Sequence, residues 1–118
     1  MEQNKREIGW KYERIAGEYL QTLGYEIIEY NYHSRNGEID IIAKQHGYFV
    51  FIEVKYRESE KNGHPLEAVS VSKQRTISKC AFSYLQRYGL QGVPVRFDVV
   101  GILGKEIRVI QNAFDFLI

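Results

Sequence analysis

Two short segments of the chain are expected to form strands, yet each interrupts its apolar run with charged residues. They are Gly37–Ile42, with the sequence GEIDII, and Phe51–Lys55, with the sequence FIEVK. Burying a charged side chain is costly unless the charge is paired or binds a metal ion. A protein that holds acids on mostly buried strands gives up stability, which indicates that these two segments contribute to a functional site.

The alternation of side chains along a strand predicts which residues of the first segment lie together. Glu38 and Asp40 are predicted to share one face. Ile39 and Ile41 are then predicted to share the opposite face, where they would join an apolar core. On this reading the two acids of the segment point to the same side of the sheet.

The two segments are predicted to pair as an antiparallel hairpin around Gln45–Gly47. Glu53 and Lys55 then share one face of the second strand. Residues opposite each other in an antiparallel pair share a face, so two registers bring acids together. Pairing Asp40 with Glu53 leaves a four-residue loop, and pairing Glu38 with Glu53 leaves a two-residue loop. Either register places the two acids within about 5–8 Å of each other.

The remaining chain alternates between helix and strand patterns. Apolar periodicity predicts helices over about residues 5–23 and 72–88, and strands over about 25–32, 38–43, 48–56, 94–103 and 106–111. Gly24 and Gly89 are placed to end the two helices. The polar stretch 57–70 predicts a loop near the acids. The order of helix, three strands, helix and two strands predicts a mixed α/β fold, with residues 1–118 in a single domain.

Composition narrows the class of protein. An apolar fraction of 44% predicts a folded chain. No apolar stretch approaches the length of a membrane span, and the N-terminal sequence lacks the apolar centre of a secretory signal, so we expect a cytoplasmic protein without a membrane partner. Cys80 is the only cysteine, which excludes an intrachain disulfide and a thiolate metal cluster. The formal net charge of +1 neither requires nor excludes nucleic acid.

The acids suit the hydrolysis of phosphodiester bonds, which needs a hard cation, a deprotonated water and charge stabilisation at phosphorus. Mg²⁺ binds through few carboxylates and keeps several waters. Asp40 and Glu53 are predicted to supply one carboxylate each, and the backbone carbonyl of Val54 a third ligand. Lys55 would then orient or deprotonate the attacking water, or offset charge on the phosphate. Glu13, on the first helix, would hold a water or a second ion.

The pattern of an aspartate, a distant Glu-x-Lys and an upstream helical glutamate resembles the core motif of the PD-(D/E)XK nucleases, whose core has the order α-β-β-β-α-β. The runs GWKYERIAGEYLQTLGYEIIEYNYHSRNGEIDIIA, FVFIEVKYR and FDVVGI resemble, more closely still, the YraN-type family of predicted bacterial endonucleases, related to archaeal Holliday-junction resolvases. This resemblance covers nearly the whole chain. It implies a restriction-endonuclease-like fold with a mixed sheet flanked by helices, and DNA cleavage that depends on Mg²⁺, with Mn²⁺ as a substitute.

The resemblance also implies roles for individual residues. Glu13 corresponds to the helical acid of the motif and Asp40 to the metal-binding aspartate. Glu53 and Lys55 correspond to the Glu-x-Lys pair. The sequence departs from the general motif at Ile39, where that motif has a proline before the aspartate. Without the resemblance, Glu53 and Lys55 have a simpler interpretation as a partly exposed ion pair that contributes little stability.

Other polar residues are assigned from their positions. Arg57 is predicted to contact phosphate or to pair with an acid of the site. Glu38 is predicted to lie next to the metal ligands or at the end of its strand, without binding the metal directly. Lys73 and Arg75 open the second helix, where an N-terminus favours anions, so we expect them to contact a nucleic-acid backbone or else to be solvated. Asp98 is expected to be a structural acid that bonds the second helix.

Together these patterns predict a metal-dependent endonuclease acting on DNA. The sequence contains no appended module for reading bases, which favours structure-selective or single-strand-directed action over sequence-specific cleavage. The alternative is a non-catalytic nucleic-acid-binding or scaffolding protein on the same fold. RNA is a third option, because the same chemistry would accept it. Resolvase relatives act as dimers, so the resemblance is compatible with a homodimer.

Overall fold

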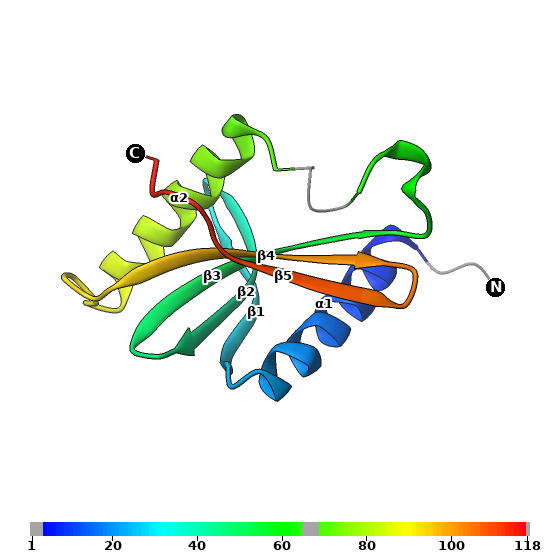
Figure 1. The fold of residues 1–118 in the computed structure, drawn as a ribbon. Helices are drawn as coiled ribbons and strands as arrows, with labels where there is room; N and C mark the ends of the chain where they lie inside the picture. Colours follow the sequence, from blue (N-terminus) through cyan, green and yellow to red (C-terminus); the bar gives the residue numbers. More distant parts are fainter. Residues whose placement is uncertain (1–3, 65–68, 118) are drawn as a thin grey trace.

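The computed structural model describes residues 4–64 and 69–117. These form a five-stranded mixed sheet with one helix on each face (Figure 1). The elements are α1 (Lys5–Thr22), β1 (Glu26–Ser34), β2 (Gly37–Gln45), β3 (Tyr48–Arg57), η1 (Glu60–Asn62), α2 (Val71–Arg87), β4 (Val95–Leu103) and β5 (Glu106–Phe114). The predicted α/β class and order of elements are confirmed, with η1 added in the predicted loop and the last strand three residues longer than expected. Neither helix in this part of the chain is long and apolar enough to cross a bilayer.

The strands lie in sequence order across the sheet, from β1 to β5. β3 and β4 run parallel, and the other neighbours are antiparallel. A parallel pair needs a crossover connection, and α2 is the helix of that crossover. β3 is therefore an inner strand with a neighbour on each side, and its residues are held in place by two ladders.

The β2–β3 hairpin has the register predicted to bring Asp40 and Glu53 together. Pairing runs without a slip from the middle of the strands to the turn, from Ile41–Ile52 to Gln45–Tyr48. The loop therefore has the two residues His46 and Gly47 and not four, so the predicted loop length was wrong. The φ angles of these two residues are 52° and 82°, as a tight hairpin turn with the right twist requires.

The two faces of the sheet carry separate apolar cores. One lies under α1 and contains Ala16, Leu20, Tyr25, Ile41, Ala43, Val50, Ile52, Val54, Val100 and Ile102. The other lies under α2 and contains Tyr32, Ile39, Ile42, Phe51, Ile77, Cys80, Ala81, Tyr84 and Phe97. Each helix thus stabilises one face of the sheet by covering apolar side chains, which fixes both helices relative to β2 and β3.

The prediction that Ile39 and Ile41 share a face is wrong. Ile39 packs in the core under α2, and Ile41 packs in the core under α1. In the neighbouring strand, Asn31 has a φ of 54° and lies between the residues that pair with these two isoleucines. A residue in the left-handed region distorts a strand locally and interrupts the alternation of faces. Asp40 lies at this distortion, between the two isoleucines.

Close packing of α1 on β1 fixes the helix one turn beyond Glu13. A Cβ atom at Gly17 would overlap the ring and hydroxyl of Tyr30, so only glycine allows this approach. The guanidinium of Arg14 lies over the same tyrosine ring, 4.1 Å from its centroid. These contacts fix the position of α1 along β1, and they thereby fix the distance from Glu13 to β2.

Candidate active site

Three acidic side chains from three elements meet where the pairing of β2 with β3 ends. Asp40 of β2 lies one position beyond the last β2–β3 pair, and its Oδ2 accepts a hydrogen bond of 2.8 Å from the backbone N–H of Val54. Glu13 of α1 lies within hydrogen-bonding reach of Asp40, and Asp40 lies within the same reach of Glu53 of β3. The structure therefore brings the three predicted acids together at one point of the sheet.

Burial and mutual repulsion raise the pKa of each of these acids. Burial raises the pKa of Asp40 to about 6, the hydrogen bond from Val54 opposes this effect, and the charge of Glu13 adds to it. Burial also raises the pKa of Glu13, although hydrogen bonds to Asn31 and Asp40 offset part of that rise. Like charges that share a partly desolvated site hinder one another's ionisation, and a bound cation relieves that repulsion.

Glu53 is 5% exposed and has two lysine neighbours. Its Oε1 lies 3.3 Å from the Nζ of Lys55 and 3.9 Å from the Nζ of Lys73. Burial, followed by repulsion from Asp40, raises the pKa of Glu53 to about 7, while the two ammonium groups act in the opposite direction. Lys73 reaches this carboxylate from the first turn of α2, so both helices contribute side chains to the site.

Two buried polar atoms at the site have no hydrogen-bond partner in the described part of the chain. They are Oε1 of Glu13 and Nε of Arg57. Leaving a buried donor or acceptor unpaired destabilises a fold by about 1–3 kcal/mol. The unpaired carboxylate oxygen suits a hard cation or a water bound to one, and the unpaired guanidinium N–H suits an anion.

The donor set fits magnesium better than a metal held by protein ligands alone. Among the described residues, no group of three histidine, cysteine, aspartate or glutamate side chains is arranged to hold a metal ion. Mg²⁺ does not need such a group, because it keeps several waters and uses one or two carboxylates. Asp40, Glu53 and the carbonyl of Val54 stay the predicted donors of such a site.

The structure treats the other predicted site residues differently. Glu38 forms a 3.4 Å contact with Nδ1 of His33, and its charge adds to the repulsion at Glu13. Arg57 is partly buried at the end of β3, with its Nε unpaired as described above. Arg75 is exposed on α2, and no ion pair or hydrogen bond among the described residues joins it to the acids. Lys73 is therefore the residue of the helix start that the fold brings to the site.

Two features of the site escaped the sequence analysis. Asn31 hydrogen bonds Glu13 from β1, and Lys73 contacts Glu53 directly. Asparagine is depleted in strands and tolerates positive φ, so its presence in a strand pattern was a usable signal. The Lys73–Glu53 contact left no such signal, because it depends on where the crossover helix packs.

Cavities that contain site residues lie on both sides of α1. A cavity of about 340 Å³ is lined by Lys5, Arg6, Gly9, Trp10, Glu13, Asn31, His33 and Glu38. Another, of about 440 Å³, is lined by Ile8, Tyr12, Tyr56, Arg57, Glu58, Ser59 and Lys61. A third, of about 280 Å³, is lined by Val54, Lys55, Tyr56 and Arg57. A fourth cavity, at the C-terminal end of α2, is lined mainly by apolar residues and contains none of the site residues.

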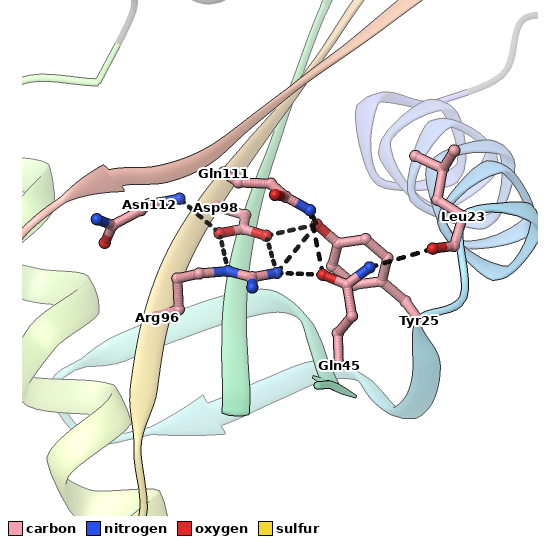
Figure 2. A network of polar contacts seen from close by, with 7 residues as sticks. All are labelled: Leu23, Tyr25, Gln45, Arg96, Asp98, Gln111 and Asn112. Carbon is pink, nitrogen blue, oxygen red and sulfur yellow. Dashed lines mark hydrogen bonds and ion pairs between the residues drawn. The ribbon is translucent and has the colours of Figure 1, made fainter. Parts of the chain in front are cut away.

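Asp98 does not bond the second helix, so that prediction was wrong. It pairs with Ile52 in the parallel β3–β4 ladder, and Ile52 packs under α1. Residues opposite each other share a face, which turns Asp98 away from α2. Its Oδ2 accepts a hydrogen bond of 2.6 Å from the hydroxyl of Tyr25, and its two oxygens accept bonds of 2.9 Å from the guanidinium of Arg96 (Figure 2).

Further polar groups complete this network, which we call the Arg96–Asp98 network (Figure 2). The backbone N–H of Asn112 donates to Oδ1 of Asp98 at 2.9 Å. Gln45 accepts from Arg96 at 2.6 Å and from Gln111 at 3.1 Å. The network joins residues before β1, at the end of β2, in β4 and in β5, which indicates a structural role.

The comparison with known proteins places the chain in a family. The model of a family described as "Uncharacterised protein family UPF0102" matches residues 12–102, a range that includes Glu13, Asp40, Glu53 and both lysines. A UPF0102 protein of Lachnoclostridium phytofermentans is 49% identical over 113 residues, covering 95% of this chain and 96% of that protein.

Two further UPF0102 proteins are similar over most of the chain. The one from Chlorobium phaeobacteroides is 48% identical over 101 residues, covering 86% of this chain and 80% of that protein. The one from Caldicellulosiruptor saccharolyticus is 42% identical over 117 residues, covering 94% of this chain and 99% of that protein. The resemblance to the YraN-type family is confirmed, and the chain belongs to the UPF0102 family.

Proposed function

We propose that this protein is a Mg²⁺-dependent endonuclease that hydrolyses phosphodiester bonds in DNA, with structure-selective or single-strand-directed action. The observation that carries the proposal is the contact between Asp40 and Glu53, a partly buried and a buried carboxylate from neighbouring strands, with Lys55 3.3 Å from the second. A fold keeps like charges together at a cost in stability, so their persistence supports a functional role.

The chain's own groups divide the chemistry among them. Asp40, Glu53 and the carbonyl of Val54 would hold the ion, and Mn²⁺ would fit the same oxygens. When bound, the ion supplies a polarised phosphate oxygen and a water of lowered pKa. Lys55 orients the attacking water or offsets charge on the phosphate. Glu13, whose Oε1 has no partner among the described residues, positions a water molecule or supports a second ion.

Basic groups around the acids would bind the substrate backbone. The buried Nε of Arg57 is an unpaired donor next to Lys55 in the same cavity, which suits a phosphate oxygen. Lys73 would exchange Glu53 for phosphate once a cation neutralises the carboxylate. Arg75 is exposed and would contact the backbone farther from the scissile bond. Glu38 would act through its repulsion of Glu13 and not as a ligand.

A cleavage assay combined with calorimetric titration tests this proposal. Wild type is expected to bind Mn²⁺ and to cut branched or single-stranded DNA when Mg²⁺ or Mn²⁺ is present. Asp40→Asn is expected to lose both ion binding and cleavage, and Asp115→Asn, which changes an exposed acid outside the site, to keep both. Cleavage that persists in Asp40→Asn, or wild type that binds no ion, would contradict the mechanism.

A non-catalytic nucleic-acid-binding or scaffolding protein is the second candidate. The observation that favours it is that Glu53 already has Lys55 and Lys73 as partners, so the carboxylate has cationic neighbours without an ion. Binding of DNA without turnover under all metal conditions would support this candidate. A homodimer belongs to the endonuclease proposal, because paired cuts need two sites, and sedimentation velocity would test it.

A further inference from the structure

The cavity of about 340 Å³ beside Glu13 combines an exposed aromatic ring with basic side chains. It lies between the first half of α1 and the β1–β2 hairpin, from which His33 and Glu38 contribute. Trp10, the only tryptophan of the chain, is 48% exposed on the wall of this cavity. The acidic cluster explains the position of Glu13 but gives no reason for the exposed indole.

The basic side chains of this cavity are available to a ligand. The guanidinium of Arg6 lies 5.7 Å from the centroid of the Trp10 ring, as in a cation–π contact. Within the described residues, no carboxylate comes within the 4.0 Å ion-pair distance of Lys5 or Arg6. Glu38, in contrast, has His33 at 3.4 Å. An anion with a planar ring matches these free cations and the indole.

The order of these groups along α1 matches the parts of a nucleotide. An α-helix rises about 1.5 Å per residue, so Trp10 lies about 4.5 Å along the axis from Glu13, and Lys5 and Arg6 lie about 6–7.5 Å farther on. A strand whose scissile phosphate lies at the acids would therefore meet the indole next and the two cations after it.

We infer that this cavity binds one unpaired nucleotide beside the scissile phosphate, with its base stacked on Trp10 and its phosphate held by Lys5 and Arg6. The inference rests on the proposed endonuclease function and, of the two modes proposed there, selects action on single-stranded nucleic acid. A base inside a duplex has both faces covered by its neighbours, whereas an unpaired base offers a face to an aromatic side chain.

Tryptophan fluorescence tests the inference directly, because Trp10 is the only source of tryptophan emission. The probe is an oligothymidylate of about 12 nucleotides, within the usual range of single-strand site sizes. With EDTA present, the measurement does not depend on cleavage. We expect the oligothymidylate to quench the emission, and a blunt duplex of the same length to leave it nearly unchanged.

Variants separate stacking from general attraction to DNA. Trp10→Ala is expected to weaken oligothymidylate binding, measured by anisotropy of a labelled strand, by about 5- to 150-fold, the range for loss of one base–aromatic stack. Trp10→Phe is expected to restore most of the affinity. Tyr88→Ala is the matched control, because Tyr88 is 49% exposed with the guanidinium of Arg87 5.3 Å from its ring centroid, on the distant end of α2.

The outcomes distinguish this inference from the endonuclease proposal. Absence of quenching, equal quenching by the duplex, or unchanged affinity in Trp10→Ala would overturn the nucleotide site. If DNA is cut with Mg²⁺ but Trp10 gives no signal, the endonuclease stands and the nucleotide site is overturned. If Trp10 reports stacking and no condition gives cleavage, the nucleotide site is supported and the endonuclease proposal fails.

Discussion

Asp40 and Asp98 occupy similar positions in the sheet but have opposite surroundings. Each lies on an inner strand, β2 or β4, next to an edge strand that contains an asparagine with positive φ. These asparagines are Asn31 in β1, at 54°, and Asn112 in β5, at 52°. Both aspartates therefore lie where an edge strand departs from regular geometry, and the groups around them decide what each one does.

The surroundings of Asp98 balance its charge. It is fully buried, and Tyr25, Arg96 and the backbone of Asn112 all donate to it (Figure 2). Burial by itself would lower the pKa of Arg96, but the hydrogen bond to Asp98, the charge of Asp98 and the contact with Tyr25 together raise it. Burial and the bond to Asp98 also raise the pKa of Tyr25 to about 12. Each of these three partners thus donates a hydrogen bond to the Asp98 carboxylate.

The surroundings of Asp40 leave charge unbalanced. Its described contacts are one backbone donor, from Val54, and two other carboxyl groups, those of Glu13 and Glu53. One of the Glu13 oxygens has no partner in the described part of the chain. A buried acid whose oxygens are all hydrogen-bonded stabilises the contact between strands. Acids that lie together with too few neighbouring cations are instead typical of a ligand-binding or catalytic site. The following experiments test this contrast, in order of decreasing effect.

Asp98→Ala is expected to cause the largest loss of stability. The substitution leaves the largely buried guanidinium of Arg96 without its carboxylate, and breaking a buried ion pair in this way reduces the free energy of unfolding by about 3–5 kcal/mol. Urea denaturation followed by circular dichroism would measure the change. A loss below about 1 kcal/mol would show that the Arg96–Asp98 network is not the main polar support of β5.

Glu53→Gln is expected to remove activity while keeping the fold. Loss of a direct metal ligand should lower the rate of DNA cleavage by at least about 100-fold. Even mutation of residues that only hydrogen-bond to metal ligands lowers metal affinity or activity by about 10- to 100-fold. Single-turnover cleavage with Mg²⁺ would measure the rate, and the denaturation midpoint would serve as the control for folding. Activity within a few-fold of wild type would remove Glu53 from the mechanism.

Asp40→Asn is expected to stabilise the metal-free protein at pH 8. In the folded state the pKa is raised to about 6 for Asp40 and about 7 for Glu53, from ordinary values of 3.8 and 4.5. The folded state therefore binds protons at these two acids more tightly than the unfolded state does. Their contribution to the free energy of unfolding is fully present below about pH 4 and is lost as the pH rises through 6 and 7. Because the introduced amide does not ionise, the variant avoids part of this loss, and its free energy of unfolding at pH 8 should exceed that of wild type by about 1–2 kcal/mol.

Unfolding of wild type and Asp40→Asn in EDTA at pH 5 and pH 8 would measure this effect. The gain should appear at pH 8 and shrink at pH 5, because Asp40 already carries more of its proton there. If the proposed site binds Mg²⁺, the ion should stabilise wild type at pH 8 and have little effect on the variant, which lacks one of the two carboxylates. If the variant is less stable than wild type at pH 8, the ionised acids do not destabilise the folded protein.

Lys73→Gln is expected to have the smallest effect. It removes one of two ammonium groups beside Glu53, so we expect DNA affinity to fall about 3- to 10-fold, with a shallower dependence on salt. Arg75→Gln is the matched control from the same helix turn, and its effect should stay below that of Lys73→Gln. Filter binding at several salt concentrations would compare them. A larger effect at Arg75 would reverse the assignment.

The candidate site was predictable where it depends on one hairpin. Turn position and strand alternation were enough to place Asp40, Glu53 and Lys55 together, because the residues that pair lie within 20 positions of one another. The face of Ile39 could not be obtained in this way, because Asn31 of another strand disturbs the local geometry. Glu13 was assigned through the family resemblance, since its own spacing indicates only the edge of a helix.

The distant members of the Arg96–Asp98 network could not be predicted by a local rule. Tyr25 precedes Asp98 by 73 positions, and Gln45 precedes Arg96, the residue that donates to it, by 51. These groups meet only once the strands are assembled in one sheet. The same is true of Lys73, which reaches Glu53 only after the crossover helix packs on its face. Such contacts depend on where the apolar face of each helix packs on the sheet.

Periodicity, turn residues and charge within short segments therefore predicted the element order, limited the hairpin to two registers and identified Asp40, Glu53 and Lys55. These follow from the sequence because backbone geometry restricts side chains that are near in the chain. Packing alone decided which acids are left with too few cations and which are fully paired. That outcome depends on desolvation and on the distance between groups from separate elements, and neither is defined until both helices lie on the sheet.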